Sequence, residues 1–438
     1  ITMQVMKWSV IALAVAAGST QMAMASSQSE SKGFIEDSSF NIFNRALYMN
    51  RDYKNGADTT TDPASAKRNG YSEEFGLGIR LMYESGFTQG TVGVGFDAHS
   101  LSSIKLDTGE GRAGIGQFDR NGLGQAEDTQ SEVGGAIKFR VSDTVLKHGN
   151  MIVESPVLST DDSRILPEVA TGTMITSNEI EGLELTAGRF TAISSQRSTD
   201  RDTYGLTSIN LLGANYSFTD NFSGAIHASD VEDHYKKYYV NLNYNLPLAE
   251  EQALNFDFNA YRTSDTGKKL SGEVDNTIWS LATAYSFGAH TVTIAHQRST
   301  GNTGYVYGNN GGVDAAGTIW LANSVQYSDF DREDENSWQA RYDIDMATFG
   351  VPGLSFMTRY ITGTNITVRD EFGDITAKNA KEHEFNVEAK YVVQEGAAKD
   401  LSFRVRSAIY RADSDQNGSY GSDNNDVRLI IEYPLSVL

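Results

Sequence analysis

The sequence predicts an all-β protein: a transmembrane antiparallel β-barrel of 18 strands, with inward-folded loops that constrict its pore. The composition combines 41 Gly, 21 Tyr and 20 Phe with 6 Pro, which is typical of many strands anchored by aromatic residues and joined by tight turns. From residue 40 onward, apolar and polar residues alternate with a period of two. Short connections also alternate with longer polar ones along the chain, as they do in bacterial outer-membrane barrels.

Composition excludes several other classes of protein. The chain has 438 residues, is 39% hydrophobic and has a mean hydropathy of -0.38, whereas a helical membrane protein needs apolar runs of about 20 residues. Aromatic residues make up 10%, which argues against a disordered chain. The absence of cysteine excludes disulfides and thiolate chemistry. With 57 acidic and 36 basic residues, the net charge of -21 disfavours nucleic acid as a partner.

The N-terminus has the three parts of a secretory signal in order. Lys7 is followed by the apolar stretch 8–17, and Ala23-Met24-Ala25 has the small-x-small form of a cleavage site. An apolar core of about ten residues is too short to span a bilayer. We therefore expect residues 1–25 to be a signal peptide and residues 26–438 to form the barrel, in the bacterial outer membrane.

The alternating segments have one apolar and one polar face. In 338–346, Trp338, Ala340 and Tyr342 alternate with Gln339 and Arg341. In a soluble sandwich such apolar faces would meet inside, whereas in a membrane barrel they face lipid and the polar faces line a lumen.

Connection lengths decide between these two architectures. Short connections are predicted at 85–90, 142–143, 178–182, 219–221, 247–253, 287–289, 347–353 and 394–400. Between them lie nine mostly long polar loops, near 52–70, 104–130, 149–169, 191–202, 230–235, 263–275, 298–336, 362–381 and 411–425. Eight turns and nine loops join eighteen strands, and an even count leaves both termini on the short-turn side. A sandwich has no reason to segregate its loops in this way.

One apolar stretch, 319–330, interrupts this pattern. Counting it as a strand gives nineteen and reverses the loop alternation for everything after it. We therefore place it inside loop 298–336, folded into the lumen; an extra strand is the alternative.

Signatures of enzymes and cofactor sites are absent or weak. There is no Gly-x-Ser-x-Gly, His-Glu-x-x-His or P-loop, and no pair of the seven His has zinc spacing on a helix face. The Gly-x-Gly-x-x-Gly match at 109–114 has no convincing strand before it or helix after it. Asp413 to Gly418 copies the opening of a calcium loop, but Asn424 stands where the bidentate Glu belongs. We expect neither an enzyme nor a cofactor; segment 411–425 is interpreted as a solvated acidic loop, with a weak divalent-cation site as the alternative.

Basic residues gather on the polar faces that would line the lumen. They are Arg45, Arg80, Lys138, Arg140, Arg341, Arg359, Lys390, Arg404, Arg406 and Arg428. Arg404 and Arg406 are two residues apart, so both point to one face about 7 Å apart. A row of guanidinium groups can pass an anion from one to the next without holding it too tightly. The alternative is that these cations pair with lumenal acids: Asp257, Asp343, Asp345, Glu388 and Glu432. Acidic residues in the loops, including 331–335 and 423–426, suggest an acidic rim at the lipopolysaccharide surface, with solvation alone as the alternative.

Several segments resemble one known family, the OprD-like outer-membrane carboxylate channels of pseudomonads. The segments are Phe34-Ile35-Glu36-Asp37-Ser38-Ser39, Met49-Asn50-Arg51-Asp52, Tyr83-Glu84-Ser85-Gly86-Phe87-Thr88-Gln89-Gly90, Ser163-Arg164-Ile165-Leu166-Pro167, Leu321 to Phe330, Ser337 to Asp343, and Tyr433-Pro434-Leu435-Ser436. The resemblance spans nearly the whole chain, and none of these segments is a general porin feature.

The resemblance implies a narrow pore, in a monomer or a labile homotrimer, for facilitated diffusion of small carboxylate solutes, some carbapenem antibiotics among them. It implies a basic ladder at Lys390, Arg404, Arg406 and Arg428, with Arg164 on a loop, and an opposing acidic side at Tyr327 and Asp329. We expect aromatic or cyclic carboxylates in preference to basic amino acids. The predicted lumen offers many guanidinium groups for a carboxylate, whereas its one acidic site for an ammonium group is only inferred from the resemblance. A structural or adhesive barrel without transport is the alternative function.

Overall fold

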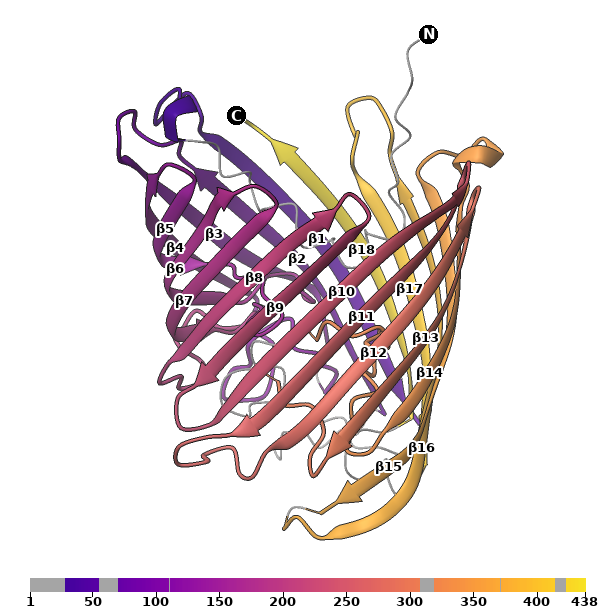
Figure 1. Cartoon of the computed structure of the whole chain (residues 1–438). Coiled ribbons are helices and arrows are strands. Elements are labelled where there is room, and N and C mark those ends of the chain that lie inside the picture. Colours follow the sequence, from indigo (N-terminus) through magenta and orange to yellow (C-terminus); the bar gives the residue numbers. More distant parts are fainter. Residues whose placement is uncertain (1–27, 55–69, 110, 308–318, 371, 414–422) are drawn as a thin grey trace.

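The protein is a closed barrel of strands (Figure 1). The computed structural model describes residues 28–54, 70–109, 111–307, 319–370, 372–413 and 423–438. The described residues contain two single-turn 3-10 helices, Gln28–Glu30 and Ala347–Phe349, and eighteen strands. The strands are β1 Ser39–Tyr53, β2 Tyr71–Glu84, β3 Gly93–Asp107, β4 Thr129–Val141, β5 Thr144–Met151, β6 Val169–Ile180, β7 Leu183–Ser194, β8 Ile209–Thr219, β9 Phe222–Val231, β10 Tyr235–Ala249, β11 Gln252–Asp265, β12 Asp275–Phe287, β13 His290–Gly301, β14 Asn336–Asp345, β15 Leu354–Arg369, β16 Ile375–Val392, β17 Ser402–Ala412 and β18 Asn424–Ser436.

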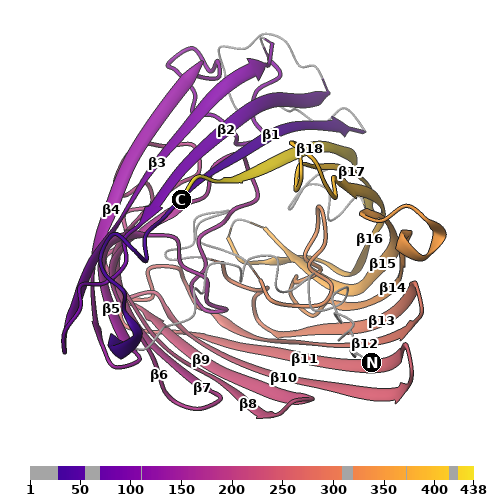
Figure 2. The same ribbon diagram turned by 90° about the horizontal axis from the view of Figure 1, so that it is seen from above.

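Every strand pairs antiparallel with its neighbours in the chain, and the last strand pairs with the first. β1 and β18 run side by side from Asn41 opposite Ser436 to Tyr53 opposite Asn424. Because β1 also pairs with β2, the sheet closes into the ring seen in Figure 2 and leaves no free edge. The prediction of an eighteen-stranded antiparallel barrel is confirmed. Among the described residues, no helix is long and apolar enough to cross a membrane.

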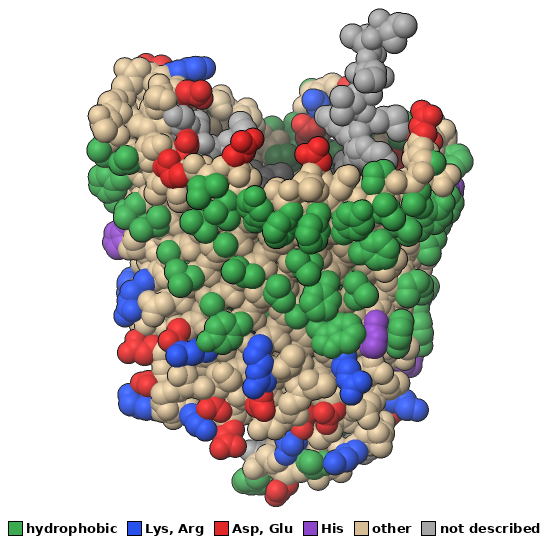
Figure 3. Space-filling model, viewed as in Figure 1, with side chains coloured by type: hydrophobic (Ala, Val, Ile, Leu, Met, Phe, Trp, Pro, Cys, Tyr) green, Lys and Arg blue, Asp and Glu red, His purple; other side chains and the backbone are tan. Residues whose placement is uncertain are grey.

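The alternation places apolar residues outside and basic residues inside. On β4, Ile137 and Phe139 are 44% and 37% exposed, while Lys138 and Arg140 between and beside them are buried. Figure 3 shows the consequence, a broad band of hydrophobic side chains across the face of the barrel in view. In a membrane these exposed residues contact lipid, and the polar faces line the lumen.

All eight short turns occur where the sequence predicts them, but one predicted long loop is wrong. Segment 362–381 was expected to be a loop, whereas β15 continues to Arg369 and β16 begins at Ile375. Ile366, Val368 and Ala380 form a small buried cluster that holds this hairpin together. The left-handed backbone of Asn365, with φ of 66°, accompanies irregular strand pairing and helps to explain why the pattern did not look like a strand.

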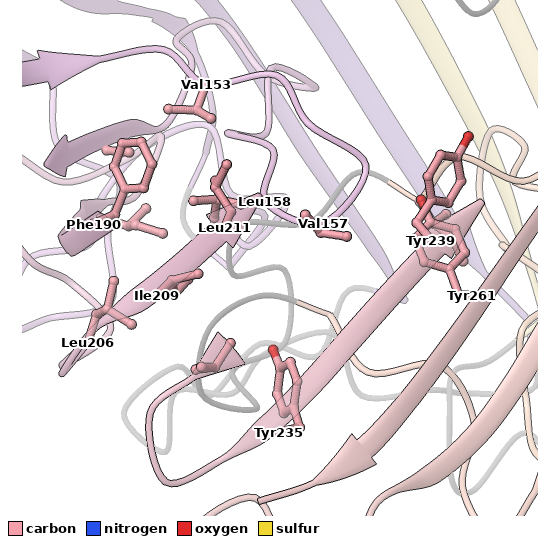
Figure 4. Close-up of a cluster of buried hydrophobic side chains, with 14 of the residues drawn as sticks. Val153, Val157, Leu158, Phe190, Leu206, Ile209, Leu211, Tyr235, Tyr239 and Tyr261 are labelled. Atoms are coloured by element: carbon pink, nitrogen blue, oxygen red, sulfur yellow. The ribbon is translucent and has the colours of Figure 1, made fainter. Parts of the chain in front are cut away.

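Long loops fold back into the barrel and fill part of it. A hydrophobic cluster joins Val157 and Leu158 of the β5–β6 connection to Ile319 and Leu321 of the β13–β14 connection (Figure 4 shows the first two). These side chains pack on the inner faces of β6 to β12, where Tyr261 is 1% exposed. The described part of 319–330 contains no strand, and Ala322 N donates to Ser280 Oγ on β12 at 3.0 Å. The expectation that this stretch lies inside the lumen is confirmed.

Candidate functional site: the basic wall of the lumen

The four predicted ladder residues meet on three neighbouring strands. Lys390 on β16 lies opposite Arg404 on β17, and Arg406 lies opposite both Glu388 on β16 and Arg428 on β18. Inward-facing residues two apart on one strand are about 7 Å apart, and neighbouring strands are about 4.8 Å apart. The structure therefore brings the four cations into one patch, which we call the basic wall.

Two of these cations share one carboxylate and keep free donors. Glu388 lies 3.2 Å from Arg404 Nε and 2.9 Å from Arg406 Nε. The terminal nitrogens of both guanidinium groups make no hydrogen bond to another described residue, and the side chains are 32% and 21% exposed. Each arginine therefore presents donors that a second carboxylate can use.

Arg428, by contrast, is held by the protein itself. Its Nε donates to Asp426 Oδ1 at 2.7 Å and its Nη2 donates to the carbonyl of Gln326 at 2.7 Å. Asp426 also binds Arg51 Nε at 2.8 Å. Because the Arg428 side chain is 9% exposed and Gln326 belongs to the β13–β14 loop, this arginine fastens the infolded loop to the wall.

Two cations on the wall lack a carboxylate partner among the described residues. Lys390 has no ion pair there, and the Nε of Arg359 on β15 donates only to the side-chain amide of Asn386, at 2.7 Å. Arg359 lies opposite Arg341 on β14, whose guanidinium is bound by Asp343 at two positions. Arg359 was expected to face the lumen but was not assigned to the site; its inward position two strands from Arg406 extends the wall toward β14.

Arg164 is not brought into the basic wall. It lies in the β5–β6 loop, where its Nε donates to the carbonyl of Ile115 at 3.1 Å and its Nη1 to Ser163 Oγ at 2.8 Å. The neighbouring Asp162 instead makes the contact between this loop and the strands. Its carboxylate binds Arg45 Nη1 at 2.9 Å and Arg80 Nη2 at 2.6 Å, and the loop thereby covers two further inward cations.

Tyr327 lies against the basic wall rather than across the lumen from it. Its ring packs on Tyr410 of β17 at 4.8 Å between centroids, and the guanidinium of Arg51 lies 5.2 Å from the ring centroid. The backbone N–H of Tyr327 donates to Glu384 of β16 at 3.1 Å. The expected position on an opposing side is therefore corrected; the loop follows the wall because Glu384 and Asp426 offer acceptors there.

Asp329 belongs to a buried carboxylate pair around one tyrosine. Tyr307 Oη lies 2.5 Å from Asp329 Oδ2 and 2.6 Å from Asp331 Oδ2. One hydroxyl donates one proton, so the second close contact requires a carboxylic acid that donates back. Burial and then the adjacent Asp329 raise the pKa of Asp331 to about 7, which supplies that acid below neutral pH.

Acidic residues that were assigned to the outer rim are partly inside. Asp426 and Glu335 are both 0% exposed, and Glu333 is bound by Arg369 at 2.7 Å from Nε. Asp426 and Glu333 hold strand cations and Glu335 accepts from the backbone N–H of Arg332, so the expected acidic rim is smaller than the sequence suggests. Within the described residues no group of three or more His, Asp or Glu could hold a metal ion, and most of the calcium-like segment lies outside them.

A closed barrel with an apolar belt, infolded loops and a charged lumenal wall defines the class of protein: an outer-membrane channel. Residues 32–437 match the model of a family described as outer membrane porin, OprD family. The chain is 46% identical to Porin D of Pseudomonas aeruginosa over 100% of both chains. The crystal structure of Pseudomonas aeruginosa OprD is 43% identical, with a TM-score of 0.77 over 94% of this chain and 99% of that one. Pseudomonas aeruginosa OpdK, solved with vanillate, is 32% identical, with a TM-score of 0.78 over 92% of this chain and 100% of that one.

The chain therefore belongs to the OprD family of outer-membrane porins, which act as channels for small solutes rather than as enzymes. Its location is the bacterial outer membrane.

Proposed function

We propose that this porin passes small carboxylate solutes by facilitated diffusion along the basic wall, driven by the solute gradient. The observation that carries the proposal is the local charge balance. Lys390, Arg404, Arg406 and Arg428 lie near three carboxylates, Glu388, Asp426 and Glu432. Two of these carboxylates also bind other cations, because Asp426 pairs with Arg51 and Glu432 pairs with Arg45. This excess of positive charge stands in a chain whose net charge is -21.

The proposed path uses the cations that the protein leaves available. A carboxylate would bind the free donors of Arg404 and Arg406 and the ammonium of Lys390, while buried Arg359 would add positive charge behind them. Several sites of moderate strength suit conduction, because a solute must be able to leave each one. Arg428, Arg164, Tyr327 and Asp329 would contribute indirectly, by holding the loops that shape the passage.

Aromatic or cyclic carboxylates are the proposed solutes. A similar protein of the family was solved with vanillate, an aromatic carboxylate. Carbapenems, which join a carboxylate to a fused ring, are proposed as further passengers. A monomer or labile homotrimer remains the expected assembly.

Basic amino acids are the second candidate, favoured by Asp257 on β11. Its Oδ1 accepts from the amides of Asn241 and Asn243 at 2.9 and 3.0 Å, and it has no ion pair with a described residue. Asp257, on the inner face of β11, could bind the ammonium or guanidinium group of a solute while the basic wall binds the carboxylate of the same solute.

The test is single-channel current of the purified protein in a planar bilayer, titrated with benzoate and separately with arginine. Modulation by benzoate at lower concentration than by arginine supports the aromatic branch. The reverse order moves the proposal to basic amino acids. A folded, inserted protein without conductance would support the structural or adhesive barrel instead.

A further inference from the structure

Basic side chains also occur on the outside of the barrel, where the lipid-facing surface ends. The outward apolar residues are followed by Arg262 on β11 and by Arg298 on β13, and they are preceded by Lys236 on β10. All three lie toward the long loops, which in bacterial barrels are extracellular. Figure 3 shows basic side chains, with acidic ones between them, below the hydrophobic band on the face in view. We call Lys236, Arg262 and Arg298 the basic belt.

Strand pairing places these three residues close together on the outer surface. Lys236 lies opposite Ser264, two residues from Arg262 on the same face of β11. Arg262 lies opposite Thr277 on β12, which lies opposite Thr300, two residues from Arg298 on β13. Two strand spacings and two residues separate the Cα atoms of Arg262 and Arg298 by about 12 Å. Arginine side chains extend far enough to converge on one ligand across that distance.

An aromatic row marks the depth of the basic belt in the membrane. Trp279 on β12 lies opposite Arg298, and its ring centroid is 5.2 Å from that of His296. His296 in turn lies 4.3 Å from Trp338, which is 51% exposed. Tryptophan rings gather where hydrocarbon meets the headgroups. The belt therefore lies at headgroup level, in the outer leaflet.

The protein satisfies these cations only in part. Arg298 is exposed and has no ion pair with another described residue. Arg262 pairs with Asp275, but the two side chains are 48% and 50% exposed, and Lys236 Nζ is 3.7 Å from Asp230. Exposed pairs of this kind contribute little and exchange readily. Guanidinium groups bind phosphate through two parallel hydrogen bonds, so the belt offers a receptor for phosphate at the depth where lipid phosphates lie.

We propose that the basic belt binds the phosphate groups of a phosphorylated glycolipid in the outer leaflet. The site is separate from the lumen, because all three side chains face away from it. Bound lipid would anchor the β10–β13 side of the barrel, which carries the base of the infolded β13–β14 loop.

The test measures lipid binding to the full-length protein in nanodiscs, with bisphosphorylated lipid A and phosphate-free lipid A as probes. The double variant Arg262→Gln with Arg298→Gln is compared with Lys268→Gln, an exposed loop lysine whose partner is Asp233. We expect the double variant to bind bisphosphorylated lipid A about tenfold more weakly, as loss of one or two charge-assisted hydrogen bonds predicts. The control should bind like the wild type, and phosphate-free lipid A should bind weakly to all three proteins.

Channel current reports folding independently, and it should be unchanged in the double variant because its side chains face outward. Should the double variant fail to fold, Arg298→Gln alone removes a donor without breaking an ion pair. Equal lipid affinity of wild type and variant would overturn the proposal. Displacement by inorganic phosphate at the lipid's own concentration would point to a simple anion site instead. Loss of wild-type binding in EDTA would mean that a divalent cation links the lipid phosphate to Asp230 and Asp275. That result would also overturn the proposal.

Discussion

The carboxylate of Asp162 accepts two hydrogen bonds from the guanidinium of Arg80, at 2.9 and 2.6 Å. Burial alone would raise the pKa of Asp162, but Arg45 and Arg80 hold it below its usual value. The carboxylate is therefore charged at neutral pH and cancels positive charge on the lumenal wall. A loop residue thus sets how much of the inward basic charge a solute meets.

Removing the negative charge of Asp162 should leave more positive charge on the lumenal wall for anions to meet. In Asp162→Asn, Arg45 and Arg80 lose their loop partner, and we expect higher anion selectivity and a larger, noisier single-channel current. The measurement is reversal potential under a salt gradient. Asp128→Asn is the matched control, because Asp128 is 87% exposed and pairs with Lys105 outside this contact. Unchanged selectivity in Asp162→Asn would contradict a screening role.

The pair Arg404 and Arg406 should matter more for aromatic carboxylates than for lysine. Replacing both with Ala removes the free donors beside Glu388, and we expect benzoate flux in liposome swelling to fall several-fold, with lysine flux falling less. Lys399→Gln, in the exposed turn before β17, removes a charge away from the lumen and should change neither flux. Equal loss of both solutes would contradict guidance by the basic wall.

Lys390 and Arg428 should separate transport from stability. Lys390 has no ion pair with a described residue, so Lys390→Gln should reduce benzoate modulation with little change in apparent Tm. Arg428→Gln removes a donor to buried Asp426 and to the Gln326 carbonyl. That should lower stability by about 2 kcal/mol, since a buried group loses a charged partner while Arg51 remains. Thermal unfolding and current together check both; a reversed pattern would contradict the assigned roles.

The carboxylate pair around Tyr307 should make the infolded loop sensitive to pH. The pKa of Asp331 rises from 3.8 to about 7 on folding, so the folded loop holds this proton more tightly than the unfolded chain. Protonated Asp331 stabilises the folded loop fully when the pH is below the pKa of Asp331 in the unfolded chain. This stabilisation is lost as the pH rises through about 7. We expect anion current to change between about pH 6 and pH 8, and Asp331→Asn, which stays neutral, to remove that change. A wild-type current that is flat over this range would contradict the shared proton.

Period-two alternation and loop lengths sufficed to predict the strand number, the eight short turns and which side chains face inward. They sufficed because each depends on local pattern and on the closure of an even-numbered barrel. The basic wall followed from parity on β16 to β18. The sequence could not predict the contacts that depend on how a long loop folds. Asp426 was expected in an acidic rim, yet it is buried between Arg51 and Arg428. Tyr327 was placed on the wrong side of the lumen for the same reason.

The seam between β1 and β18 has a consequence for biogenesis. Arg45 and Glu432 are joined across it by a 2.8 Å ion pair although they are 387 residues apart in the chain. That seam can form only after the last strand has been delivered, and until then β1 and β17 both expose unpaired backbone groups. A chain truncated before β18 would therefore keep two unpaired strand edges, and we expect it to aggregate rather than to form a smaller pore.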